Sequence, residues 1–473
     1  MTVLDIGIIV VYFVLIIGVG VYSSKRANTT DNYLIAGQRL GYTLTLACLC
    51  AVMLGGASTI GTTALGYRFG ISGMWLVSML GLGLALVGFF LIKKIRKSNI
   101  LTVAQLLTNR YGRKAGVLGA VVSSLYTMLV CATQIIAMGT ILQGLAGWNP
   151  VVSMLVVGCI VIAYTILGGM WAITITDFIQ FILIVIGICF IMLPFSVNAA
   201  GGFENMVNTL PSSYFDITSI GWSTIIQYFF LYCLGALVGQ DIWQRYLTAK
   251  SVKVARRSGL GAGIFILFYA VACALIGMAA QVFMPGAENA QLVFADMAQG
   301  ILPTGLLGVV LVSVLAVLMS TASGTLLASS SLLANDVIKP FLTERSEKKK
   351  GSVLETAESD KRDLRVSKKV TALIGAIAMV IAVALNDVLV ALDVSYAILS
   401  GALFFPIILG IFWKKTSSKA ALIAIAVSSV VVLGGLAIMG TSAIEPIACG
   451  LVVGLILMVS ITVFETRKNK DLT

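Results

Sequence analysis

Hydrophobic residues in this chain are gathered into long blocks that short polar segments separate. Each block approaches or exceeds the roughly 20 residues that a helix needs to cross a bilayer core, and the blocks recur from end to end. This pattern predicts an all-α polytopic membrane protein. We expect thirteen spans, at residues 4–22, 42–66, 73–92, 115–145, 150–168, 172–196, 221–239, 256–284, 303–335, 369–385, 389–412, 419–438 and 443–464.

The composition supports this class of protein. Of the 473 residues 59% are hydrophobic and only 11% are charged, and the mean hydropathy is +1.02. A soluble domain of this length needs far more charge to cover its surface. The first block has no basic segment before it, and Lys25 and Arg26 follow it, so we interpret it as a retained helix and not as a cleavable signal.

The net charge of +12 reflects topology. With the N-terminus outside, only Arg68 among the 32 Lys and Arg residues falls on the external side, and the external segments 196–220 and 285–302 contain none. Basic residues favour the cytoplasmic side. We therefore expect the N-terminus outside, the C-terminus inside, a bacterial plasma membrane and no nucleic-acid partner. Arg68 either attracts anions or snorkels at the interface.

Several classes of chemistry are excluded. The chain has no histidine, which removes His-based catalysis, His-ligated metals and His proton relays. Its eight cysteines lie in or beside spans without metal-ligand spacing, and we assign them no function. The polar segment 339–369 is expected to be a mobile cytoplasmic linker, too short for a catalytic domain. We expect that the protein is not an enzyme. We expect it to reside in the lipid bilayer and to need no obligate protein partner.

Glycines weaken two spans, as in transporters whose repeats begin with a broken helix. The alternative is that they only allow neighbouring helices to pack closely. The glycines are Gly55, Gly56 and Gly61 in span 42–66, and Gly235 and Gly239 in span 221–239.

Broken helices at these two places would begin two five-helix inverted repeats, at 42–196 and 221–412, the second including the 339–369 linker. The remaining parts are an extra helix with a cytoplasmic loop at 1–41, an external loop at 197–220, and two C-terminal helices with a tail at 413–473.

Asp177 is an ionisable residue about six positions inside a predicted span, where a charge needs a partner. No Lys or Arg is expected at that depth, so a bound cation or a proton is the predicted partner. Four other acidic residues lie near external helix ends, and we assign them structural roles. Asp241 and Arg245 lie at a cytoplasmic helix end, and we assign them surface or capping roles. The external group comprises Asp5, Asp387, Asp393 and Glu445.

Hydroxyl side chains concentrate in "VLAVLMSTASGTLLASSS", residues 314–331. Ser320, Thr321, Ser323 and Gly324 fall within roughly 160° of one helix face. A hydroxyl in a membrane helix often bonds its own backbone, but several beside a broken helix can ligate a hard monovalent cation. Ser329, Ser330 and Ser331 are assigned to packing or an exit path.

Four spaced segments resemble the sodium/solute symporter family, which includes proline, pantothenate, sialic acid and sodium/glucose transporters. They are "TDNYLIAGQRLGYTLT" at 30–45, "YTILGGMWAITITDFIQ" at 164–180, "GQDIWQRYLTAKS" at 239–251 and "LAVLMSTASG" at 315–324. The resemblance implies a leucine-transporter-type 5+5 inverted-repeat fold with one helix before the core and two after it. It also implies symport by alternating access, with sodium as the coupling ion.

The resemblance further implies a main sodium site at the first broken helix and the eighth core helix. The matching ligands are the backbone carbonyls of Ala51, Leu54 and Val317 and the hydroxyls of Ser320 and Thr321. Some members hold a second sodium, and Asp177 and Ser323 match that pattern. Gly324 stands where a serine is expected, so Asp177 either helps bind a second ion or supports the first site electrostatically.

The solute positions implied by the resemblance are small and rather apolar, with a few hydroxyls and amides, which favours an amino acid or organic acid over a sugar. A carboxylate could bind backbone N–H groups freed by the broken helix. The matching positions are Met53, Gly55, Ser58, Gln134, Gln227, Tyr228 and Tyr232.

The sequence predicts a sodium-coupled symporter that imports a small organic solute. Two alternatives stay open. One is a proton-coupled transporter that uses Asp177, and the other is a transporter-like solute sensor that signals through its cytoplasmic segments.

Overall fold

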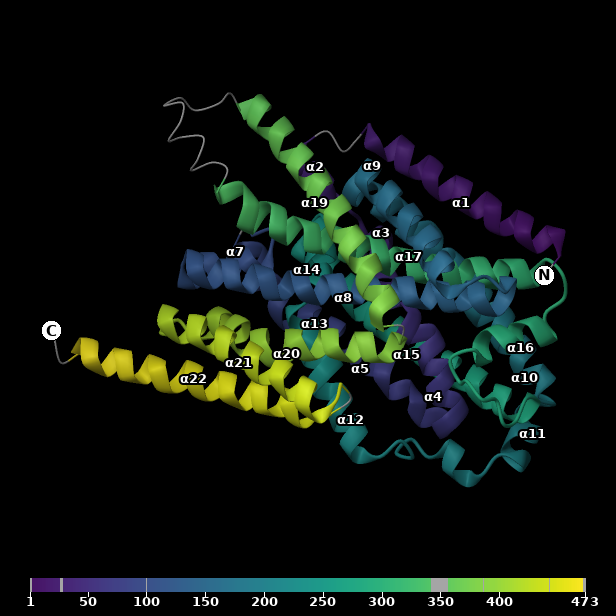
Figure 1. The fold of residues 1–473 in the computed structure, drawn as a ribbon. Coiled ribbons are helices and arrows are strands. Elements are labelled where there is room, and N and C mark those ends of the chain that lie inside the picture. Colours follow the sequence, from purple (N-terminus) through teal and green to yellow (C-terminus); the bar gives the residue numbers. More distant parts are fainter. Residues whose placement is uncertain are drawn as a thin grey trace.

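The computed structural model describes residues 2–25, 29–98, 100–341, 356–385, 387–441 and 443–470. All regular elements in these ranges are helical, and the one β-type pairing there is an isolated bridge between Leu40 and Ala249. Figure 1 shows the helices as a bundle in which α1 and α19 lie over α9 and α17, and α21 and α22 lie along the opposite side.

The helices are α1 Val3–Ser24, α2 Thr30–Ile35, α3 Tyr42–Met53, α4 Thr62–Phe69, α5 Trp75–Leu86, α6 Ile92–Lys97, α7 Val103–Tyr111, α8 Arg113–Ala146, α9 Pro150–Ile184, α10 Leu193–Ala199, α11 Gly202–Thr209, α12 Trp222–Tyr228, α13 Leu234–Val238, α14 Gln240–Thr248, α15 Val252–Phe283, α16 Val293–Ile301, α17 Leu306–Leu332, α19 Thr356–Leu385, α20 Val388–Phe412, α21 Ser418–Met439 and α22 Glu445–Lys470. Short π-helical turns follow or join several of them, at Ala57–Gly61, Val87–Leu91, Val185–Met192, Phe229–Cys233 and Leu333–Ile338.

Several helices begin at caps that the sequence encodes. Asn149 accepts a hydrogen bond from Val151 N at the start of α9, where Pro150 occupies the first turn. Ser251 caps α15 and Asp387 caps α20 in the same way. Asp5 accepts hydrogen bonds from the amides of Gly305 and Gly308, which ties α1 to the start of α17. The structural roles predicted for Asp5 and Asp387 are confirmed.

Ten helices in the described residues are long and apolar enough to cross a membrane, or 11 if the bent pair Trp222–Val238 and Gln240–Thr248 forms one span. Two of the ten, Ala57–Lys97 and Pro150–Ala199, contain 41 and 50 residues. As straight helices they would measure about 60 and 75 Å, twice the thickness of a hydrocarbon core. Each of them turns back on itself.

The turn in α9 lies at Gly169, whose φ of 53° lies outside the helical region. Tyr164 Oη donates to Met319 O at 2.8 Å, and Ser313 Oγ donates to Leu183 O at 2.7 Å. Residues 164 and 183 would lie about 28 Å apart in a straight helix, yet their partners on α17 are separated by only about 9 Å. The chain therefore reverses between them.

The other long segment turns at Gly70, whose φ is 66°. Along the first half of this segment, the contacted residues of α15 and its C-terminal end have increasing residue numbers. Along the second half their residue numbers decrease, so α4 and α5 are antiparallel. These pairs are Thr59 with Tyr269, Tyr67 with Met284, Gly81 with Ile266, and Gly88 with Gly259. The predicted spans separate both halves at these turns, and the number that cross the membrane stays a prediction.

The centre of the bundle is α17, in which every residue from Val310 to Leu332 is buried. Figure 1 shows this helix among α1, α3, α8 and α9. The first turn of α1 and helices α11 and α16 lie at one end of the bundle, and the C-terminal part of α22 lies at the opposite end (Figure 1). The hydroxyl-rich face of α17 is thus held inside the protein and away from lipid.

One boundary of the predicted organisation is wrong. The prediction assigned 339–369 to a linker, but the helix that begins with α17 continues to Phe341, and α19 already begins at Thr356. Glu, Lys, Arg and Ala are good helix formers, so the charged stretch before residue 369 extends the following apolar helix. Residues 342–355 of the predicted linker lie outside the described residues.

Candidate functional site

The first core helix is broken. Helix α3 ends at Met53, Leu54 is extended with φ −88° and ψ 108°, and the helix resumes at Ala57 as a π-turn. The break is the one predicted from the glycines, and both glycines also allow close packing. A Cβ at Gly55 would lie 2.6 Å from Gln134 Oε1, and one at Gly56 would overlap Ala137. The broken helix and the close packing occur together.

The hydroxyl face of α17 meets this break. Ser320 Oγ lies 2.9 Å from Ala51 O and 2.8 Å from Val317 O. Thr321 Oγ1 lies 3.1 Å from Ala51 O, 2.8 Å from Leu54 O and 3.3 Å from Val317 O. The structure therefore brings together all five residues that the family resemblance implies as ligands of the main sodium site.

Five oxygens without a formal charge converge at this point, three from carbonyls and two from hydroxyls. In the structure the hydroxyls donate to these carbonyls. The break has removed the usual helical partners of Ala51 O and Leu54 O, whereas Val317 O lies within the continuous helix α17. Both hydroxyl groups can rotate their protons away and present lone pairs. The donor set then suits a hard monovalent cation, which prefers several oxygen ligands.

Asp177 has a partner that the sequence analysis did not predict. Its Oδ2 lies 3.4 Å from Arg245 Nη2, and both side chains are fully buried. The surface roles predicted for Arg245 and Asp241 are wrong, because both side chains are buried. Asp241 does lie in the first turn of α14, which agrees with the capping alternative. The expected partner of Asp177, a bound cation or a proton, is replaced by a guanidinium group of the chain itself.

The reason lies in a second helix break. Helix α13 ends at Val238, Gly239 is extended, and α14 continues from Gln240 at an angle of 46°. The predicted span ends at residue 239, whereas α14 continues through the protein interior and all nine of its residues are buried. Gly324 makes room for Arg245, since a Cβ there would overlap the guanidinium group.

Ser323 is not joined to Asp177 by a hydrogen bond in the described part of the chain. Its Oγ donates to Ser320 O at 3.1 Å, within α17 itself. Asp177 Oδ1 and Arg245 Nε have no hydrogen-bond partner among the described residues. The two residues predicted for a second ion are both buried, but Asp177 is paired with Arg245 instead.

A small cavity of about 20 Å³ lies against the first broken helix. This volume holds about one water molecule, so a solute requires the surrounding helices to move. Met53, Gly55, Ser58 and Gln134 line it, as predicted for the solute site, and so does Thr321. Gln134 Oε1 accepts a 2.7 Å hydrogen bond from Gly56 N, an amide that the break has freed.

The other three predicted solute residues do not line the cavity. The Tyr232 ring is 5.2 Å from the ring of Tyr396, a lining residue, and its hydroxyl donates to Asp393. The Tyr228 ring lies against the Tyr232 ring, with centroids 5.4 Å apart and an angle of 52° between the ring planes. Gln227 is half-buried one position before Tyr228 on α12. Asp393, expected to be structural, thus holds an aromatic group next to the cavity.

Sequence reasoning missed two polar lining residues, Asp241 and Tyr396. Asp241 lies in the first turn of α14, and Tyr126 Oη donates to its Oδ1 at 3.3 Å. A glycine followed by an acid at the start of a helix is a known signal for a helix N-terminus. That signal, in "VGQD", could have shown that a new half-helix begins there.

Comparisons with known proteins agree with this architecture. The chain is 25% identical to the high-affinity proline transporter PutP of Bacillus subtilis over 436 residues, which cover 88% of each chain. It is 27% identical to a sodium/proline symporter of Staphylococcus aureus over 448 residues, covering 90% of this chain and 84% of the relative.

Among solved structures, the chain resembles a substrate-bound, outward-open Na⁺-coupled sialic acid symporter. The TM-score is 0.82 with 22% identity, and the match covers 98% of both chains. The transporter Mhp1 in a closed conformation matches with a TM-score of 0.56, 14% identity and coverage of 93% and 94%. These likenesses confirm the leucine-transporter-type fold. The model of the sodium:solute symporter family matches residues 33–428, and the chain therefore belongs to this family.

Proposed function

We propose that this sodium-coupled symporter of the cell membrane imports a small zwitterionic solute of the amino-acid type. Sodium as coupling ion and a small organic solute follow from the family. The finer proposal concerns the ligands. Sodium would be held by the carbonyls of Ala51, Leu54 and Val317 and by the hydroxyls of Ser320 and Thr321.

The observation that carries the proposal is that Thr321 belongs both to the proposed sodium site and to the lining of the cavity. Its hydroxyl bonds the broken helix at Leu54 O, and the same residue lines the cavity beside Gly55 and Ser58. An ion bound there would fix the helix break that forms one wall of the solute site. Each ligand would then raise the affinity of the other, because such coupling is reciprocal.

A zwitterion fits the charges around the cavity. Asp241 supplies a buried carboxylate at one side, and the break at Gly55 and Gly56 opens backbone N–H groups at the start of a new helical segment. Of these, Gly56 N donates to Gln134 in the structure, so a solute carboxylate would take the place of the Gln134 oxygen. Asp177 and Asp241 carry two negative charges and Arg245 one positive charge, which leaves one net negative charge. A sodium ion or the ammonium group of a solute would balance it.

The ion pair between Asp177 and Arg245 supports one sodium per transport cycle. Asp177 already has a buried cationic partner and does not require a second ion. The same pair weakens the alternative of proton coupling through Asp177. In this proposal Asp177 and Ser323 are structural neighbours of the main sodium site.

The transport cycle would follow from the two broken helices. The breaks at 54–56 and at Gly239 each lie in the first helix of a proposed repeat, 42–196 and 221–412, which supports an inverted-repeat core moving by alternating access. The N-terminus would lie outside and the C-terminus inside. No protein or nucleic-acid partner is needed for this activity.

A thermal-stability measurement on the purified protein tests the proposal. Sodium should raise the unfolding temperature relative to potassium at equal ionic strength, because a ligand that binds only the folded state stabilises it. Proline heads the solute panel, since it is named for both relatives above, followed by other amino acids, organic acids and hexoses. A response to pH without a response to sodium would favour proton coupling.

Asp241→Asn should lower the affinity for solutes that carry an amino group more than the affinity for solutes that lack one. We expect the affinity for an amino acid to fall at least tenfold, a change of about 1.4 kcal/mol, because the carboxylate that pairs with the ammonium is lost. The des-amino analogue should lose much less, since asparagine can still accept the Tyr126 hydrogen bond. Competition against sodium-driven uptake in proteoliposomes measures both. Equal losses for both solutes would assign Asp241 a purely structural role.

A further inference from the structure

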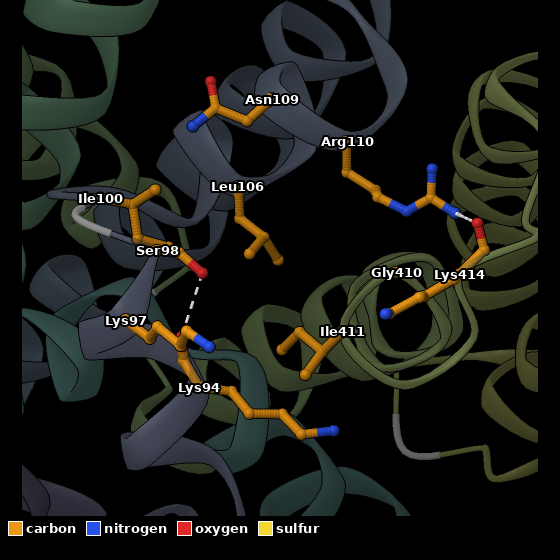
Figure 2. A pocket seen from close by; sticks show the side chains of 10 residues that line it. All are labelled: Lys94, Lys97, Ser98, Ile100, Leu106, Asn109, Arg110, Gly410, Ile411 and Lys414. Carbon is orange, nitrogen blue, oxygen red and sulfur yellow. Dashed lines mark hydrogen bonds between the residues drawn. The ribbon is translucent and has the colours of Figure 1, made fainter.

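A basic pocket lies where α6, α7 and the segment after α20 meet, with a volume of about 470 Å³. Figure 2 shows its four cationic side chains, Lys94 and Lys97 on α6, Arg110 on α7, and Lys414 after α20. No acidic residue is among the ten that line it. In the described residues none of the four cations forms a salt bridge. The pocket therefore concentrates positive charge that the described residues leave without a salt bridge.

Two of the cations are held in place by the protein. Arg110 Nη2 donates to Lys414 O at 2.6 Å (Figure 2). It also donates to Thr416 Oγ1 at 2.8 Å, and the two bonds tie α7 to the segment following α20. Lys94 Nζ lies 3.5 Å from the centre of the Phe412 ring, a cation–π contact. The positive charges are thus positioned around one space by contacts among three elements.

The rest of the pocket is apolar. Ile100 and Leu106 are buried in its floor, and Ile411 is half-buried beside them. Next to the pocket, Phe412 is 50% exposed. Phe90, exposed by 55%, lies in the π-helical turn Val87–Leu91 that leads into α6. The positive pocket is therefore close to exposed apolar side chains at one end of the bundle.

We propose that the basic pocket binds the headgroup of an anionic phospholipid. The phosphate would lie among Lys94, Lys97, Arg110 and Lys414, and the acyl chains would lie against Phe90 and Phe412. A free inorganic anion would make no use of the apolar floor or of the exposed rings. Basic pockets between transmembrane helices are known to hold anionic headgroups. A bound lipid would join α6 and α7 to the end of α20.

Lipid retention in native mass spectrometry tests this directly on the full-length protein. Purified protein is titrated with phosphatidylglycerol, and separately with phosphatidylcholine as the uncharged comparison. The triple variant Lys94→Gln, Lys97→Gln and Lys414→Gln should bind phosphatidylglycerol roughly 100-fold more weakly, at about fivefold for each basic residue near an anionic headgroup. The control removes the same charge from exposed lysines outside the pocket lining, by K93Q, K253Q and K415Q. It should retain the lipid.

A second variant keeps all charges and fills the space. Ile411→Trp should lower phosphatidylglycerol retention while leaving the net charge unchanged. Equal losses in the pocket and control triples would overturn the proposal, because binding would then follow net charge alone. Displacement of the lipid by inorganic phosphate at similar concentration would also overturn it and identify a simple anion site. Retention is read without transport, so these outcomes do not depend on the proposed solute.

Discussion

Replacing Arg245 with glutamine is expected to destabilise the folded protein by about 3–5 kcal/mol, the usual cost of leaving one member of a buried ion pair without its partner. Arg245 and Asp177 are both fully buried, with 3.4 Å between Nη2 and Oδ2. Asp177 Oδ1 has no other hydrogen-bond partner among the described residues. Removal of the guanidinium would leave this carboxylate alone in the protein interior.

The double variant R245Q/D177N should recover most of that loss, because it removes both charges together. Thermal unfolding of wild type, both single variants and the double variant gives the coupling between the two sites. Arg256→Gln is the matched control. Arg256 is exposed on α15 above the Phe89 ring, and its loss should cost no more than about 0.5 kcal/mol. A double variant no more stable than R245Q alone would show that the pair does not stabilise the fold.

The same variants bear on the number of ions. Since Arg245 already neutralises Asp177, sodium dependence should survive in R245Q/D177N wherever the protein folds. Loss of the sodium response in that variant, with normal stability, would instead make Asp177 part of the ion site. The stability and the sodium response therefore answer separate questions about one ion pair.

The parts of the site predicted from sequence are those whose signals are local. A glycine pair inside an apolar block indicated the helix break at Gly55 and Gly56, and the hydroxyls at Ser320 and Thr321 stand out in an apolar helix. Ala51 and Leu54 entered only through resemblance to the family. Their side chains carry no signal, since the groups that meet α17 are backbone carbonyls.

The parts missed depend on where a helix goes after it bends. Arg245 was assigned to a helix end because the apolar block stops near Gly239, yet the chain bends there and α14 continues through the interior. Hydropathy cannot distinguish a polar half-helix buried in protein from one in water, since both lack the long apolar run that marks lipid exposure. Asp241 was misplaced for the same reason.

Replacing both Ser320 and Thr321 with alanine should raise the sodium concentration for half-maximal uptake at least tenfold, a loss of about 1.4 kcal/mol or more in binding. The two hydroxyls provide two of the five oxygens at the proposed site, and alanine leaves only the three carbonyls. The sodium dependence of solute uptake in proteoliposomes measures the effect. Because Thr321 also lines the solute cavity, solute affinity at low sodium should fall with it.

Ser330→Ala with Ser331→Ala is the matched control. Both hydroxyls belong to buried residues of the same helix, α17. Ser330 Oγ donates to Leu327 O at 3.0 Å and Ser331 Oγ donates to Ala328 O at 2.8 Å, so each bonds a carbonyl of α17 itself. Their removal should leave sodium dependence unchanged. Thr321→Ser keeps the oxygen and should retain most of the affinity. An unchanged sodium requirement in S320A/T321A, at normal expression and stability, would show that sodium binds elsewhere. The contact between α17 and the broken helix would then serve packing alone.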